Sequence, residues 1–133
     1  MEEREKWIGL FCARLFEENN IRFIQELQKH CQRENYRIMI FSLDTCVEED
    51  TENVPAELEL IRLSQYISLD AGIILAESIK NYVLLEHIAR IMHVKEVPCF
   101  CIERQIEGCY CLFHTEETGF EPMVRHVIQD HGA

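Results

Sequence analysis

Short apolar runs alternate with segments of helical periodicity along the chain, and this alternation limits the possible folds more than any other feature. A run that is apolar at nearly every position and too short for a helix is typical of a strand buried on both faces. The clearest example is WIGLFCA, at residues 7–13. The runs that predict strands lie at residues 7–13, 36–43, 71–76, 97–103 and 110–113, with Pro98 confined to the start of the fourth strand.

Helical patterns separate most of these runs. Apolar side chains recur at helical spacing in residues 17–34 and 82–92. Pro55 suits the first turn of a helix that continues to about Tyr66. Thr118-Gly-Phe-Glu121 resembles a capping box, which places the start of a final helix near Thr118, with Pro122 close to that start and Gly132 as a terminator. The apolar positions expected to face the core are Ile21, Ile24, Leu27, Cys31, Leu58, Ile61, Leu84, Leu85, Ile88, Ile91, Met92, Phe120, Val124 and Val127.

Strands that alternate with helices predict a parallel sheet with helices on both faces, because a parallel connection must cross over one face of the sheet. We therefore expect a single three-layer α/β domain over residues 6–132, with the flavodoxin-like strand order 2-1-3-4-5. The sequence contains no internal repeat, low-complexity tract or linker to a second domain.

Charge and hydropathy exclude several classes of protein. The 133 residues carry a formal net charge of −11, which repels phosphate backbones, so direct contact with nucleic acid is disfavoured. No apolar run reaches the roughly 18–20 residues of a membrane span. The acidic start MEEREK also lacks the layout of a secretory signal. We therefore expect a cytoplasmic protein, whose seven cysteines are mostly free thiols packed like small apolar residues.

The residues that directly follow the predicted strands are the candidate ligand-binding residues. In an open parallel sheet, ligands bind outside the carboxyl ends of the strands, where the strand order reverses. Several residues at these positions are polar and able to bind the hydroxyl groups of a small ligand. That any one of them is an ordinary hydrated loop residue remains the alternative. They are Arg14, Leu15, Phe16, Asp44, Thr45, Glu77, Ser78, Arg104, Gln105, His114 and Thr115.

Patterns typical of catalytic and cofactor sites are missing from the sequence. The segment after the first strand, ARLFEENN, has no glycine to let backbone amides close on phosphate, which argues against dinucleotide, P-loop and most flavin sites. Ala13-Arg14 and Ala76-Glu77 stand where a phosphoacceptor receiver domain needs acidic residues. Neither a Gly-x-Ser-x-Gly elbow nor an HExxH pattern occurs. We therefore expect no enzymatic activity and no cofactor in this chain.

Two pairs of cysteines form the sharpest chemical pattern. Cys99 and Cys101 are two residues apart, as are Cys109 and Cys111, so each pair shares one face of an extended segment and the four thiols can meet in space. Zinc sites and redox pairs normally have two intervening residues in a tight turn, which favours simple packing here. Metal binding and thiol redox chemistry remain alternative functions.

Four segments resemble, in order, the ligand-binding domain of the lactose-repressor/galactose-repressor family, which has the type I periplasmic-binding-protein-like fold. KWIGLFCARLFEENNIRFIQELQKHCQRENYRIMIF resembles its opening strand, helix and strand, and LDAGIILAES resembles its third strand. VPCFCIERQIEG is similar to its fourth strand and the following loop. CYCLFHTEETGFEPMVRHVIQDHG is similar to its fifth strand, turn and helix.

The resemblance implies a function and a set of sites. The family's domain has two lobes, so this chain corresponds to the first lobe, without the second lobe and without a DNA-binding headpiece. Sensor regions of this kind are similar to those fused to diguanylate cyclases or histidine kinases. The family's effector-contacting positions match Arg14, Leu15, Phe16, Glu77, Ser78, Glu103 and Arg104, while His114-Thr115 replaces the family's Asp-Asn and removes a carboxylate that can accept sugar hydroxyls.

The expected function is therefore that of a non-enzymatic lobe that senses a small molecule, a sugar or another metabolite, in a bacterial regulator or signalling protein. A homodimer is expected, with Phe23 of the first helix exposed at the dimer face as the resemblance implies. Two alternatives stay open. One is a flavodoxin-like dimerisation or interaction module with a degenerate pocket, and the other is the thiol redox or metal-binding protein.

Overall fold

Five parallel strands form the centre of the molecule, in the order β2-β1-β3-β4-β5. The computed structural model describes residues 5–43, 54–79, 82–113 and 121–130. Its strands are β1 (Lys6–Ala13), β2 (Tyr36–Leu43), β3 (Ala71–Leu75), β4 (Cys99–Ile102) and β5 (Tyr110–Leu112). The strand order, the parallel pairing and the α/β class are those predicted from the sequence, and all three are confirmed.

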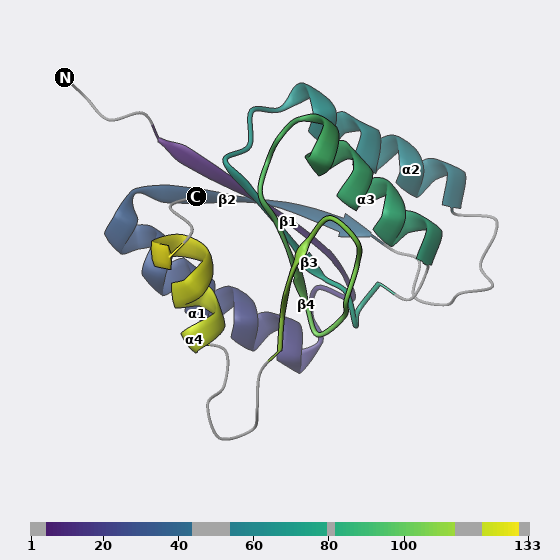
Figure 1. Cartoon of the computed structure of the whole chain (residues 1–133). Coiled ribbons are helices and arrows are strands. Elements are labelled where there is room, and N and C mark those ends of the chain that lie inside the picture. Colours follow the sequence, from purple (N-terminus) through teal and green to yellow (C-terminus); the bar gives the residue numbers. More distant parts are fainter. Residues whose placement is uncertain (1–4, 44–53, 80–81, 114–120, 131–133) are drawn as a thin grey trace.

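Helices cover both faces of this sheet, as Figure 1 shows. One face carries α1 (Glu18–Glu34) and α4 (Glu121–Arg125), which continues as a π-helical turn at His126–Asp130. The opposite face carries α3 (Tyr82–Val94) and α2 (Val54–Leu63), which ends in a 3₁₀ turn at Ser64–Tyr66. We call these the α1 face and the α3 face.

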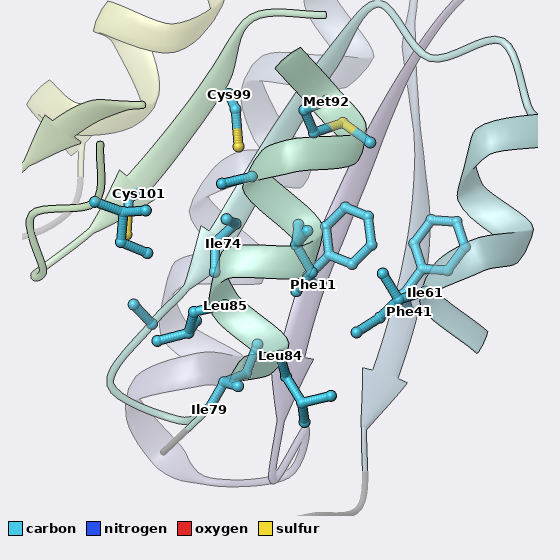
Figure 2. Close-up of a cluster of buried hydrophobic side chains, with 14 of the residues drawn as sticks. Phe11, Phe41, Ile61, Ile74, Ile79, Leu84, Leu85, Met92, Cys99 and Cys101 are labelled. Atoms are coloured by element: carbon cyan, nitrogen blue, oxygen red, sulfur yellow. The ribbon is translucent and has the colours of Figure 1, made fainter. Parts of the chain in front are cut away.

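Alternate residues of β1 supply the two cores. Ile8 and Leu10 point into the α1-face cluster, where they meet Leu27 and Val127, and all four are fully buried. Phe11 points the other way, into the α3-face cluster, where it lies beside Phe41 of β2, as Figure 2 shows. The two rings stack with their centroids 4.7 Å apart. Because neither face of β1 meets water, apolar and polar residues do not alternate along it, and its sequence is a continuous apolar run.

Glycine lets β3 lie close to the helix that covers it. A Cβ atom on Gly72 would lie 2.9 Å from Sδ of Met92, a residue of α3 that is fully buried. Gly9 of β1 is similar, because a Cβ there would lie 2.7 Å from Cδ1 of Leu69. The absence of a side chain at these two positions therefore sets how closely the α3 face packs on the sheet.

Some element boundaries differ from those predicted. The strand predicted at residues 97–103 is shorter, because the Pro98 nitrogen carries no hydrogen to donate and Glu103 turns into the left-handed region with φ of 67°. The described part of the final helix runs from Glu121, with Pro122 as its second described residue, and its last turn widens to a π-helix that the sequence pattern did not predict. The capping box at Thr118 and the terminator Gly132 lie outside the described residues.

The expectation that Phe23 is exposed at a dimer face is wrong. Phe23 is only 1% exposed and belongs to the α1-face cluster. The reason is helical periodicity, because Phe23 lies directly beside Ile24 and four residues before Leu27, so all three share the stripe that packs on the sheet. The sequence pattern predicted four core-facing residues in this helix, Ile21, Ile24, Leu27 and Cys31. The last three are buried and Ile21 is half-buried.

Within the described ranges, none of the helices combines the length and the apolar character that crossing a membrane would require.

Candidate functional site

A small, half-open pocket of about 40 Å³ lies at the carboxyl edge of the sheet, beside the first turn of α1. It lies on the α1 face next to the ends of β3 and β4, near the point where the strand order reverses between β1 and β3. This is where ligands bind in open parallel sheets. We call it the rim cavity, and its lining residues are Asn19, Asn20, Phe23, Leu75, Glu77, Ser78, Ile102 and Glu103.

Two buried polar side chains fix the end of β1 beside the rim cavity. The amide nitrogen Nδ2 of Asn20 donates hydrogen bonds to the carbonyl oxygens of Ala13, at 2.8 Å, and Arg14, at 2.9 Å. The hydroxyl of Ser78 accepts a hydrogen bond from the Ala13 N–H at 3.0 Å and donates one to the Leu75 carbonyl at 2.7 Å. Buried backbone groups at a strand end need such partners, so both side chains stabilise the site's framework.

The rim cavity combines an apolar floor with a polar, acidic mouth. Phe23, Leu75 and Ile102 supply the buried apolar surface. Glu77 is exposed and Glu103 is half-buried, and no arginine or lysine is among the residues that line this cavity. Carboxylate oxygens accept hydrogen bonds from hydroxyl and ammonium groups, and they repel anions. The arrangement therefore suits a small neutral or cationic molecule with several hydrogen-bond donors.

Two of the sequence-predicted site residues, Glu77 and Ser78, line the rim cavity. They play different parts, because the hydroxyl of Ser78 is occupied by backbone groups and Glu77 presents its carboxylate to solvent. The rule that placed them in the site was simply that they follow a strand.

The three predicted residues that follow β1 lie at the same end of the sheet but do not line the rim cavity. Arg14 adopts the left-handed conformation with φ of 53° and lies 3.8 Å from Glu17 in an exposed ion pair. Leu15 packs against the α1-face cluster. Phe16 is 85% exposed, so its ring lies in solvent rather than in the cavity.

The other predicted residues divide into two groups. Arg104 and Gln105 follow β4, and neither is among the residues that line the rim cavity; Arg104 is half-buried and Gln105 is exposed. Asp44 and His114, with their neighbours Thr45 and Thr115, lie outside the described residues.

Sequence reasoning missed three lining residues from α1, which are Asn19, Asn20 and Phe23. The strand-end rule selects only residues that directly follow a strand, and these three lie in the helix after β1. A signal was present, because Asn20 lies four residues before Ile24 and seven before Leu27, on the apolar stripe of the helix. A polar residue in such a stripe needs a buried partner. Glu103, a fourth lining residue, had been matched only through the family resemblance.

The four cysteines singled out in the sequence do meet in space, on the α3 face between β4 and β5. Among the described residues, however, no group of three or more histidine, cysteine, aspartate or glutamate side chains has an arrangement that could hold a metal ion. The metal-binding hypothesis for these cysteines therefore finds no support in the geometry of the described chain.

Comparison with known proteins shows which fold this chain shares with solved structures. No protein-family profile matches the sequence, and no curated protein matches it. Among solved structures, a LacI transcriptional regulator from Lactobacillus brevis is similar with a TM-score of 0.54 and 16% identity, over 78% of this chain and 36% of that one. A subunit of an ABC sugar transporter from Rhodobacter sphaeroides 2.4.1 is similar with a TM-score of 0.62 and 12% identity, over 96% of this chain and 42% of that one.

A third similar structure is a 3-dehydroquinate dehydratase-like protein from Bifidobacterium longum, with a TM-score of 0.58 and 7% identity, over 96% of this chain and 99% of that one. Likeness at these identities concerns the fold. The chain has the α/β architecture of a periplasmic-binding-protein-like lobe, and it spans well under half the length of the regulator and of the transporter subunit.

Proposed function

We propose that this chain is one lobe of a two-lobed domain that senses a small molecule in a regulatory or signalling protein. The observation that carries the proposal is the rim cavity, with its apolar floor and acidic mouth at the point where the strand order reverses. The similarity to a regulator and to a sugar-transporter subunit, each about two to three times longer than the matched part, supports a partner lobe beyond this one.

The ligand is a neutral or cationic metabolite rich in hydroxyl or amine groups, such as a sugar or an amino sugar. Glu77 and Glu103 supply acceptors at the mouth of the rim cavity, and the chain carries a net charge of −11. Sugar phosphates and other anions meet repulsion from both.

The proposed mechanism is a shift in the population of open and closed domains. A ligand that contacts both lobes binds the closed state more tightly and so favours it. One lobe supplies only part of the contacts, so this chain alone binds its ligand weakly. The sensor works in the cytoplasm as a homodimer and passes the change to an output domain, such as a diguanylate cyclase or a histidine kinase. The lobe itself neither touches nucleic acid nor catalyses a reaction.

The experiment is thermal unfolding of the full-length protein in the presence of separate panels of neutral sugars, amino sugars, polyols and sugar phosphates. A ligand at one hundred times its Kd adds about 2.7 kcal/mol to the free energy of unfolding, which raises Tm measurably. We expect a neutral or amino sugar, and no sugar phosphate, to raise Tm. Failure of every compound in the full-length protein to change Tm contradicts the proposal.

Matched variants locate the binding site. Glu77→Gln and Glu103→Gln remove a charge at the rim cavity and should lower the ligand-induced shift in Tm while leaving Tm without ligand nearly unchanged. Glu107→Gln, an exposed residue outside the rim cavity, is the control and should keep the full shift. If the ligand raises Tm equally in all three variants, the ligand binds outside the rim cavity.

A second candidate function is a self-contained flavodoxin-like module that mediates dimerisation. The likeness to the dehydratase-like protein favours this candidate. The match covers 99% of that protein's chain, so the same architecture also occurs without a second lobe. Light scattering across a range of protein concentrations separates the two proposals. A dimer at every concentration, together with no response to any ligand, favours this second candidate.

A further inference from the structure

Two pairs of cysteines lie side by side across the β4–β5 boundary. Cys101 of β4 is directly paired with Cys111 of β5, and the preceding pair in the register is Phe100 with Tyr110. Cys99 and Cys109 each lie one residue before that pair. All four thiols lie on the α3 face, where Cys99 and Cys101 belong to the buried cluster and Cys109 and Cys111 pack against it.

The four thiols have different surroundings. Cys99 is 3% exposed, and its interaction with the Cys109 side chain, together with burial, raises its pKa well above the ordinary value. Burial raises the pKa of Cys101 to about 12. The sulfur of Cys111 accepts a hydrogen bond from the N–H of Ile106 at 3.4 Å and lies 3.6 Å from the carbonyl oxygen of Cys109, so it is held by the β4–β5 loop.

Cys109 is the thiol of the group that is best placed to react. It is half-buried at the end of a tight turn, in which its N–H donates to the Ile106 carbonyl at 3.1 Å and Gly108 has φ of 86°. The interaction with the Cys99 side chain lowers the pKa of Cys109, although partial burial opposes the effect. Because the thiolate is the nucleophile in disulfide exchange, a partly exposed cysteine in a turn is more reactive than its buried neighbours.

We propose that Cys109 is a site of thiol–disulfide exchange with low-molecular-weight disulfides, and that Cys99 resolves the mixed disulfide to form a bond between β4 and the residue before β5. In the first step Cys109 attacks a disulfide RSSR, forms Cys109–S–S–R and releases RSH, which carries away the thiol proton. In the second step Cys99 attacks the Cys109 sulfur and releases the second RSH. The small disulfide is reduced by two electrons and the two cysteines are oxidised.

The backbone geometry permits this bond. Neighbouring strands lie about 4.7–4.9 Å apart, and disulfides join residues whose Cα atoms are about 4.4–6.8 Å apart. Cys99 and Cys109 each directly precede the first pair of the ladder, Phe100 with Tyr110, and their side chains interact within the α3-face cluster. The bond would tie down a short edge strand, Tyr110–Leu112, whose first residue is 51% exposed.

The test is incubation of the reduced full-length protein with glutathione disulfide, followed by blocking of free thiols and mass spectrometry of tryptic peptides. Trypsin separates the two pairs, because residues 96–104 (EVPCFCIER) hold Cys99 and Cys101, and residues 105–125 hold Cys109 and Cys111. We expect these two peptides to be crosslinked, with fragmentation assigning the bond to Cys99 and Cys109. The oxidised protein should also unfold at a higher temperature than the reduced protein.

Variants separate the two steps. Cys99→Ala should accumulate one glutathionyl group on Cys109, because the resolving thiol is gone, and Cys109→Ala should form no crosslink. Cys111→Ala and Cys46→Ala are the controls and should keep the crosslink. The proposal is overturned if the wild-type protein forms no crosslink, if the bond joins Cys101 to Cys111, or if glutathione stays on Cys109 of the wild type. The wild-type peptide map decides even where a variant fails to fold.

Discussion

The hydroxyl of Ser78 is bonded to the backbone N–H of Ala13, at a distance of 3.0 Å, beyond the last residues that β1 and β3 pair with each other. The β1–β3 ladder ends at Phe11 and Ile74, so this side chain continues the connection between the two strands up to the rim cavity. A residue that sequence reasoning placed in the ligand site is therefore also part of the framework that shapes it.

Ser78→Ala should destabilise the fold by about 1–3 kcal/mol, because it leaves the buried Ala13 N–H without its partner. Urea denaturation followed by circular dichroism measures this as a lower midpoint. Ser42→Ala is the matched control, since Ser42 of β2 is exposed, and it should change the free energy of unfolding by no more than about 0.5 kcal/mol. Equal effects of both changes would argue against the role of Ser78 as a strand tie.

Phe23→Ala should lower the free energy of unfolding by about 3–5 kcal/mol, the usual cost of removing a fully buried ring. Phe16→Ala, in the same segment but 85% exposed, should be nearly neutral. Unfolding is measured at several protein concentrations. If Phe23 acted at a dimer face rather than in the core, the loss would depend on protein concentration, and that result would contradict the burial described here.

Gly72→Ala should be destabilising by about 1–3 kcal/mol, because the new methyl group would lie 2.9 Å from Sδ of Met92 and must displace it. In a Met92→Ala background that contact is gone, and the same change should be neutral or slightly stabilising. A double-mutant cycle from urea denaturation measures the coupling. The same cost in both backgrounds would mean that something other than the Met92 side chain limits position 72.

The sheet was predictable because its signal is local. Each strand is an apolar run that needs no knowledge of its neighbours, and the strand order follows from general rules for parallel connections. Boundaries were less predictable, since the end of β4 depends on the left-handed conformation of Glu103, whose N–H donates to the Leu112 carbonyl of β5. Phe23 was predicted to be exposed because the family resemblance implied a dimer face there. The helical periodicity of α1, which places Phe23 beside Ile24 and Leu27, indicates burial instead.

The candidate site was only half predictable for a related reason. The rule that ligands meet the ends of parallel strands led to Glu77 and Ser78. It also led to Phe16, which lies in solvent, because the direction of a loop side chain depends on backbone angles that no sequence pattern reports. Asn20 reaches the site from the next helix, through hydrogen bonds to Ala13 and Arg14 that exist only once the chain has folded.

The buried thiols should make the fold less stable in alkaline solution. Burial raises the pKa of Cys31 from 9.0 to about 12, and that of Cys12 to about 11. Above about pH 9 the unfolded chain loses these protons while the folded chain keeps them. Ionisation therefore favours the unfolded state, and each thiol lowers the free energy of unfolding by up to about 1.4 kcal/mol per pH unit.

Cys31→Ala isolates this effect, because other groups also titrate in the same range, among them Lys95, whose pKa is lowered by burial. We expect the variant to lose less stability than the wild type between about pH 8 and pH 11, as measured by urea denaturation at each pH with a reductant present. The difference between the two proteins should grow as the pH rises past 9 and should be constant below it, where the thiol is protonated in both states. If the free energy of unfolding changes with pH in the same way for both proteins, Cys31 ionises as readily in the folded chain as in the unfolded one. That result would contradict the burial of Cys31, which is 3% exposed.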